Sequence, residues 1–167
     1  MKLIKLSLIA LLSTISLQAS SVKICNTKIN IGSTYNLRWI KEDKNRYKKQ
    51  TDKSICTLYT NKSNQITKVV KTSKIRLAIS EIPKTIKGMK FKAANIVTSG
   101  LDGVVDKKYF KSLLKSNKYI KTNSKKIKFF QAVYSNGNIE ANVFNLCQIP
   151  GFKCQLNIEY TKQKGDK

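Results

Sequence analysis

The last third of the chain carries the pattern that most constrains the fold. The dipeptide Asn136-Gly137 separates two segments rich in aromatic and β-branched residues, 126–135 and 138–147. Asn-Gly favours a type I′ turn, because both central positions of that turn need a positive φ. A second turn at Pro150-Gly151 precedes alternating apolar residues at 154–160. These features predict a three-stranded antiparallel meander.

Five earlier segments carry β-branched or aromatic residues and are expected to be strands. They are Val22–Ile31, Asn36–Ile40, Ile55–Thr60, Gln65–Val70 and Lys74–Ile82. We expect the sheet that they form with the meander to be mostly antiparallel.

One amphipathic helix is predicted over residues 106–116. Asp106 is a good N-cap, and apolar and basic side chains fall on opposite faces. The apolar face consists of Tyr109, Phe110, Leu113 and Leu114. Asp102 and Gly103 are expected in the turn that leads into the helix. The fold class expected is α+β, a mostly antiparallel sheet with a helix covering one face.

Residues 1–20 have the order of a secretory signal peptide. Lys2 and Lys5 precede an apolar stretch at 6–17, and small residues surround Ala19, near which we expect cleavage. The apolar stretch is shorter than the roughly 20 residues that cross a bilayer, although an uncleaved anchor is the alternative. We expect residues 21–160 to form a single β-rich domain without a transmembrane span, followed by a polar basic tail at 161–167. The expected location is the periplasm or the extracellular space of a bacterium.

All four cysteines, Cys25, Cys56, Cys147 and Cys154, follow this signal. An even number of cysteines in an exported chain predicts disulfides. Of the three possible connectivities we favour Cys25–Cys56 with Cys147–Cys154, because these pairs are nearest in sequence. A four-cysteine zinc site would be expected to show closely spaced cysteine pairs, which this chain lacks, so we expect neither a metal nor another cofactor.

The chain carries 33 Lys+Arg against 9 Asp+Glu, a formal net charge of +24, and it has no histidine. The missing histidine excludes Ser-His and Cys-His catalytic pairs. Nearly all the basic residues are lysine, because only Arg38, Arg46 and Arg76 are arginine. Arginine is the residue that pairs bidentately with phosphates and base edges, so its scarcity argues against sequence-specific nucleic-acid binding.

The segment from residue 107 to residue 128 has nine lysines and no acidic residue. This lysine span consists of Lys107, Lys108, Lys111, Lys115, Lys118, Lys121, Lys125, Lys126 and Lys128. Such a surface can dock on phosphates, sulfates or anionic head groups; the simpler interpretation is a solvated face over a core. A second basic segment, residues 41–53, is interpreted as a solvated loop.

Two functions from different classes follow from these features. The first is an exported, non-enzymatic binding protein that engages an anionic partner, such as an envelope polysaccharide, a lipid head group or an acidic protein surface. The second is a small secreted hydrolase or toxin acting on nucleic acid or cell wall without histidine. Binding ranks ahead of catalysis because no carboxylate lies in an apolar context; Glu140 is interpreted as a solvent-facing strand residue.

Overall fold

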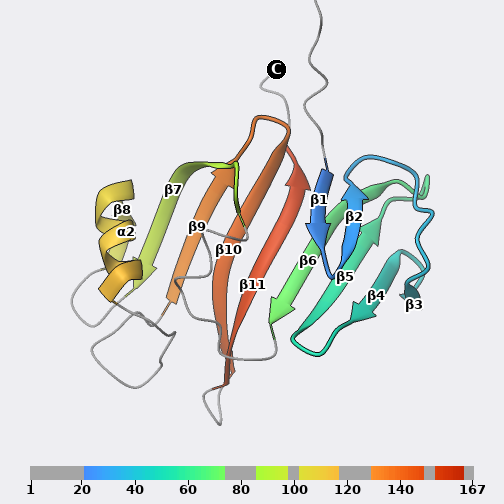
Figure 1. Cartoon of the computed structure of the whole chain (residues 1–167), viewed down its shortest axis with the longest axis horizontal. Coiled ribbons are helices and arrows are strands. Elements are labelled where there is room, and N and C mark those ends of the chain that lie inside the picture. The colour runs from blue at the N-terminus through green and yellow to red at the C-terminus, as the bar shows by residue number, and fades with distance from the viewer. Residues whose placement is uncertain (1–20, 74–85, 98–101, 117–128, 149–152, 164–167) are drawn as a thin grey trace, which may run out of the picture.

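The computed structural model describes residues 21–73, 86–97, 102–116, 129–148 and 153–163. Nine antiparallel strands form one large sheet in these residues (Figure 1). In sheet order they are β3 (Ile40–Asp43), β4 (Arg46–Gln50), β5 (Ser54–Thr60), β6 (Ile66–Ser73), β11 (Lys153–Lys162), β10 (Ile139–Gln148), β9 (Phe129–Ser135), β7 (Lys90–Val97) and β8 (Asp102–Val105). The expectation of a mostly antiparallel sheet is confirmed.

Strands β9, β10 and β11 are neighbours and pair antiparallel, as the meander predicts. The first turn differs from the expected type I′ turn. Asn136 and Ile139 close it, and Gly137, with a φ of 91°, occupies its first central position, where a type II′ turn places glycine. The reason is the Asn136 side chain, whose Oδ1 accepts the N–H groups of Asn138 and Ile139. The expected turn at 150–151 lies outside the described residues.

The N-terminal segment predicted as one strand is a hairpin. Strands β1 (Ser21–Ile24) and β2 (Thr27–Asn30) pair antiparallel. Cys25 and Asn26 between them have positive φ values of 45° and 58°. Asparagine tolerates this conformation, and a reversal there brings the two halves of the segment together.

Other strand predictions need correction. Of the expected strand Asn36–Ile40, residues 36–39 are not in a strand, because the Tyr35 hydroxyl hydrogen-bonds to both the N–H and the carbonyl of Trp39. Ile40 is the first residue of β3. The segment expected to be a solvated loop at 41–53 instead contains most of β3 and all of β4, which pair as a hairpin. The expected strand Lys74–Ile82 lies outside the described residues.

The two strands at the other edge of the sheet were missed in the sequence. In β7 the buried residues Ala94 and Ile96 alternate with more exposed ones. This alternation covers too few residues to predict a strand from the sequence, because lysines and asparagines surround it. Strand β8 contains Asp102 and Gly103, which were expected in a turn; they pair with Val97 and Ile96. Gly103 has a φ of 134°, which L-residues with side chains rarely adopt.

The helix α2 (Lys107–Ser116) confirms the predicted element. Asp106 caps it, since its Oδ1 accepts the N–H of Tyr109 at 2.8 Å. Phe110 is buried against the rings of Phe91 and Phe130. Tyr109 is 44% exposed and does not belong to the apolar face assigned to it. The side chains of Leu113 and Leu114 are outside the described part of the helix.

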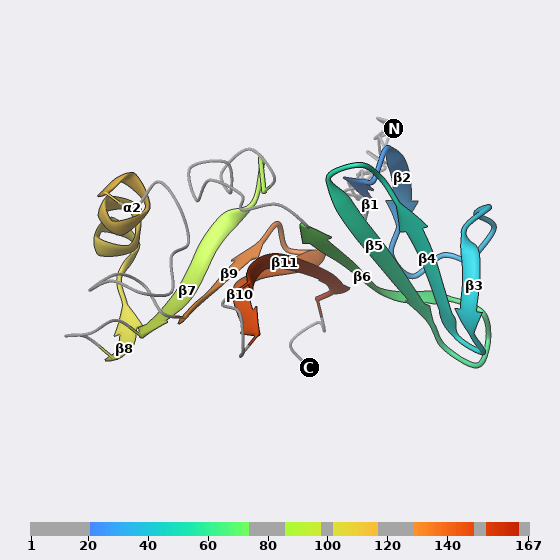
Figure 2. The same cartoon turned by 90° about the horizontal axis from the view of Figure 1, so that it is seen from below.

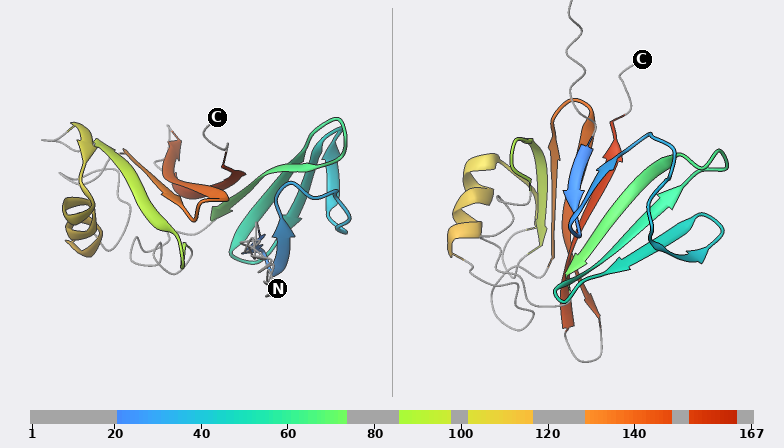
Figure 3. Two further views of the ribbon diagram at one scale, coloured as in Figure 1. Left: turned by 90° about the horizontal axis from the view of Figure 1, so that it is seen from above. Right: turned by 45° about the vertical axis from the view of Figure 1, so that its right-hand side comes forward.

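The hairpin β1–β2 and the helix α2 lie on the same side of the sheet, over its two opposite halves (Figures 2 and 3). The hairpin contributes Ile24 and Ile29 to the buried core, and α2 contributes Phe110. The disulfide Cys25–Cys56 joins the hairpin turn to β5. The candidate site lies on this side of the sheet, between the two covering elements.

Candidate anion-binding site

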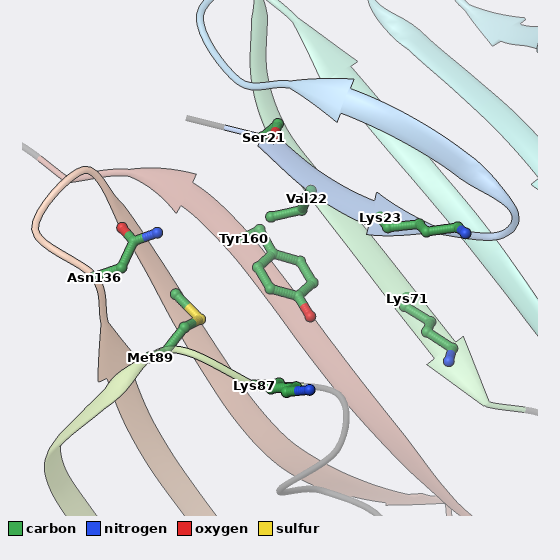
Figure 4. Close-up of a pocket in the computed structure, with 8 residues that line it drawn as sticks. All are labelled: Ser21, Val22, Lys23, Lys71, Lys87, Met89, Asn136 and Tyr160. Atoms are coloured by element: carbon green, nitrogen blue, oxygen red, sulfur yellow. The ribbon is translucent and has the colours of Figure 1, made fainter. Parts of the chain in front are cut away.

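A cavity of about 440 Å³ lies between the hairpin and the segment that enters β7 (Figure 4). We call it the lysine cavity. Its lining comes from five parts of the chain and consists of Ser21, Val22, Lys23, Lys71, Lys87, Met89, Asn136 and Tyr160. Three of these residues carry ammonium groups, and among the described lining residues none is Asp or Glu.

The pairing of β6 with β11 places Lys71 and Tyr160 in this cavity. Val69 lies directly opposite Tyr160, and Lys71 follows two positions later on the same face of β6. The neighbours of Lys71 on this face, Val69 and Ser73, are buried, whereas Lys71 is half-buried. Lys71 is thus a charged residue on a face of β6 where its two neighbours are buried in the core.

A tight turn places Lys87 and Met89. The N–H of Met89 donates to the carbonyl of Ile86 at 3.0 Å, and Gly88 has a φ of 86°. Positive φ at the third residue is what a type II turn requires, and glycine provides it without strain. Because Ile86 is buried, it anchors the turn, and Lys87 remains exposed at the edge of the cavity.

The third lysine comes from the hairpin. Lys23 of β1 is exposed and lies directly opposite Lys28 of β2. Like charges placed opposite each other across two strands are destabilising. This repulsion is relieved when an anion lies nearby, so the local charge arrangement favours an anionic ligand.

The carboxylates that pair with basic residues lie elsewhere. Glu42 contacts Arg46 and Lys48, and the hydrogen bond from Lys48 holds the pKa of Glu42 below its usual value. Glu159, adjacent to Tyr160 in β11, points to the opposite face of the sheet and pairs with Lys68. No ion pair among the described residues involves the three lysines of the cavity.

Tyr160 adds a neutral polar group to the cavity. Burial raises the pKa of its phenol to about 12, so the group keeps its proton at neutral pH and adds no negative charge beside the lysines. Its hydroxyl points toward the side of the cavity where Lys71 and Lys87 end, whereas the Lys23 side chain runs along β1 away from Tyr160 (Figure 4). A protonated phenol beside ammonium groups is suited to oxyanions.

A second cavity of about 350 Å³ adjoins the first and shares Lys87 and Met89 with it. We call it the aromatic cavity. Its lining consists of Ile86, Lys87, Gly88, Met89, Phe91, Lys107, Phe110, Lys111 and Tyr134. The two cavities connect the lysines of the sheet and hairpin with two lysines of the helix.

The predicted lysine span is only partly placed by the structure. Lys107, Lys108 and Lys111 are exposed on α2, and of these Lys107 and Lys111 line the aromatic cavity. Lys115 belongs to α2, but its side chain is not described. The remaining members lie outside the described residues; they are Lys118, Lys121, Lys125, Lys126 and Lys128.

Sequence reasoning missed Lys23, Lys71 and Lys87. They are far apart in the chain, and each lies among other lysines that point elsewhere. The turn signal Lys87-Gly88 was available, but no local pattern shows that it faces β6. The β6–β11 pairing, the docked β1–β2 hairpin and the turn before β7 together bring these residues to one cavity.

Aromatic side chains outside the two cavities have different environments. Phe129 is 38% exposed, whereas Phe130 is fully buried, so the two point to opposite faces of β9. Trp39 is buried, and Tyr47 stacks on Tyr35 with ring centroids 3.8 Å apart. These rings serve packing in the described structure, apart from Phe129.

The cysteine predictions have two outcomes. The Cys25–Cys56 disulfide is confirmed. The backbone register places Cys147 of β10 directly opposite Cys154 of β11, but their side chains are not described, so this second bond remains a prediction.

In the described residues no cluster of three or more acidic, cysteine or histidine side chains could hold a metal ion. No helix in this part of the chain is long and apolar enough to cross a membrane. Comparison of the chain with protein-family models, with curated proteins and with solved structures gives no match.

Proposed function

We propose that this chain is an exported binding protein that engages an anionic partner through the lysine cavity. The observation that supports it most directly is that Lys23, Lys71 and Lys87 all line one hollow without a carboxylate among its described lining residues. Three ammonium groups can together satisfy a sulfate, phosphate or carboxylate group.

The three cationic residues that line the cavity are all lysines, and this determines how selectively they can bind an anion. Lysine is a flexible point charge and does not impose the planar geometry that arginine does. Binding through lysines is governed by charge and is weakened by salt, because exposed charges are screened beyond about 8 Å at physiological ionic strength. We therefore expect recognition of a class of anionic surfaces and not of one nucleic-acid sequence.

Retention on immobilised heparin tests the proposal. The variant Lys23→Gln/Lys71→Gln/Lys87→Gln removes the three charges of the cavity. The control Lys41→Gln/Lys62→Gln/Lys90→Gln removes three exposed charges that line neither the lysine cavity nor the aromatic cavity and form no ion pair among the described residues. Because both variants have the same net charge, a difference between them measures the site and not the overall charge.

We expect the cavity variant to elute at clearly lower salt than the control. Equal elution of the two variants would overturn the site, and elution of the parent chain below about 0.15 M salt would overturn the function. Parallel measurements with polyglutamate and with phosphatidylglycerol vesicles distinguish a polysaccharide partner from an acidic protein and from a lipid head group.

Export is tested separately. We expect the chain, expressed in a bacterium, to be recovered outside the cytoplasm with a mature N-terminus a few residues from Ala19. Strand β1 begins at Ser21, so cleavage near Ala19 leaves the hairpin intact. Recovery in the cytoplasm with residues 1–20 retained would contradict export without affecting the anion-binding test.

The alternative of a hydrolase has less to support it. Glycosidase chemistry needs two carboxyl groups flanking the substrate, and no Asp or Glu is found among the described residues that line the lysine cavity or the aromatic cavity. Glu140 and Glu159 are half-buried on the opposite face of the sheet. The arrangement of the described residues favours binding.

A further inference from the structure

We propose that the aromatic cavity binds the hydrocarbon part of an amphiphilic anion, a single-chain fatty carboxylate, whose head group lies among Lys87, Lys107 and Lys111. The inference rests on the proposed function for the charge at Lys87, which belongs to both cavities. It goes further by naming the chemical class of the ligand.

The wall of the aromatic cavity is suited to a hydrocarbon chain. Phe91 stands at its centre, with its ring 5.9 Å from that of Phe110 and 5.7 Å from that of Tyr134. Ile86 and Met89 complete the apolar lining. Methionine is flexible and polarisable, so it adapts to ligands of different shape.

The rim of the same cavity is cationic. Lys107 and Lys111 are one helical turn apart on α2, so their side chains project from the same face of the helix. Lys87 approaches from the turn before β7 and is exposed. No residue of this described lining is acidic, so the charge of the rim is not neutralised locally.

An apolar wall together with a cationic rim favours binding of an amphiphilic anion over binding of a hydrophilic polymer. A sulfated sugar could place only the C–H face of its ring against the aromatic wall and would lose water from its hydroxyl groups there. A fatty carboxylate buries its chain against the rings and keeps its head group with the ammonium ions. Small-molecule sites commonly have this composition, a mostly apolar cleft of about 300–1,000 Å³ with a few placed polar groups.

The lysine cavity next to it has a different composition. Its lysines and Asn136 offer mainly polar contacts. Met89 lines both cavities. It therefore lies between the mainly polar lining of the lysine cavity and the mainly apolar lining of the aromatic cavity. A change at this residue therefore affects the apolar contact without removing a charge from the rim.

Calorimetric titration of the full mature chain with dodecanoate, below its micelle concentration, tests the inference. Two ligand controls separate the contributions: dodecanol has the chain without the charge, and hexanoate has the charge with a shorter chain. We expect saturable binding of dodecanoate at a stoichiometry of one, and weaker binding of both controls.

Three variants locate the ligand. Lys107→Gln/Lys111→Gln is expected to weaken dodecanoate binding about fivefold or more, since two charge contacts are lost. Lys108→Gln changes a lysine of the same helix that does not line the cavity, and we expect its affinity to stay within about twofold. Met89→Gln replaces the apolar side chain by an uncharged polar one of similar length, and because Met89 is only half-buried this variant is expected to fold and to weaken binding.

The possible results are distinct. Absence of saturable dodecanoate binding, or equal affinity for dodecanol, overturns the inference. The same loss in Lys108→Gln as in the double variant shows a non-specific charge effect and also overturns it. Retention on heparin that depends on Lys23 and Lys71 would remain in these cases, so failure of the fatty-acid site is distinguishable from failure of the proposed function.

Discussion

Cys25, in the turn of the β1–β2 hairpin, is disulfide-bonded to Cys56 in β5, with Cα atoms 6.3 Å apart. Both residues are buried. The bond fastens the hairpin to the sheet beside the lysine cavity, and Ser21, Val22 and Lys23 of the hairpin form one wall of that cavity. One covalent link therefore contributes both to stability and to the position of a candidate ligand-binding lysine.

Replacing both cysteines by alanine should lower the free energy of unfolding by about 3–4 kcal/mol, because residues 31 positions apart are no longer linked in the unfolded chain. Denaturant titration measures this change. We also expect weaker heparin retention at temperatures where the variant is folded, since β1 is then held only by its packing. Unchanged stability together with unchanged retention would show that the hairpin needs no covalent link.

The second disulfide prediction concerns Cys147 and Cys154. These residues lie directly opposite each other in the β10–β11 ladder, which brings their Cβ atoms closer together than those of any diagonal cross-strand pair. Proteolysis of the exported chain without reducing agent, followed by mass spectrometry, should give two linked peptide pairs, Cys25 with Cys56 and Cys147 with Cys154. Detection of free thiols at the second pair would contradict the prediction.

Phe110 should be the residue of α2 on which docking of the helix depends. It is 1% exposed and contacts two other aromatic rings. We expect Phe110→Ala to cost about 3–5 kcal/mol, the usual range for a buried aromatic residue.

The neighbouring Tyr109 provides the control for this experiment. It belongs to the same helix and is 44% exposed, so Tyr109→Ala should cost no more than about 1 kcal/mol. Thermal or chemical unfolding of the two variants measures the difference. Similar losses for both would mean that α2 contributes to stability mainly through its own helix formation and not through the core.

Stability should fall between pH 10 and pH 12 because of two buried tyrosines. Burial raises the pKa of Tyr134 and of Tyr160 to about 12, from 10.0. In this range the folded state keeps phenol protons that the unfolded chain has released, so rising pH favours unfolding. A difference of two pKa units corresponds to at most about 2.7 kcal/mol for each tyrosine, fully present below pH 10 and lost as pH approaches 12.

Urea titrations over this pH range measure the effect. Tyr160→Phe removes one of the two ionising groups and should make the fall in stability shallower. Tyr134→Phe removes the other ionising group and should make the fall shallower by a similar amount. An equally steep fall in the Tyr160→Phe variant would show that this phenol does not contribute.

Several elements could be predicted because their signals are local. The alternation along residues 154–160 and the Asp106 cap depend on neighbouring residues only, and β11 and α2 form where these signals occur. The β1–β2 hairpin was missed for a related reason. Its turn uses positive φ at Cys25 and Asn26, and a cysteine in that conformation gives no recognisable turn signal.

The candidate site could be predicted only in part. The helix lysines were expected as a cluster from their spacing, and Lys107 and Lys111 do line a cavity. Lys71 gave no such signal, because a lysine within a strand normally indicates a solvent-facing position. Its place beside Tyr160 follows from a strand pairing between residues more than 80 positions apart.

The sequence by itself determined the class of sheet, the capped helix and an excess of lysine with no histidine. Each of these depends on composition or on residues close together in the chain. Only the tertiary structure decided which lysines face one another, because the β6–β11 pairing and the hairpin docked over it bring Lys23, Lys71 and Lys87 into one cavity. The free energy of such long-range contacts depends on the packing of the whole sheet, so it leaves no pattern in any one segment.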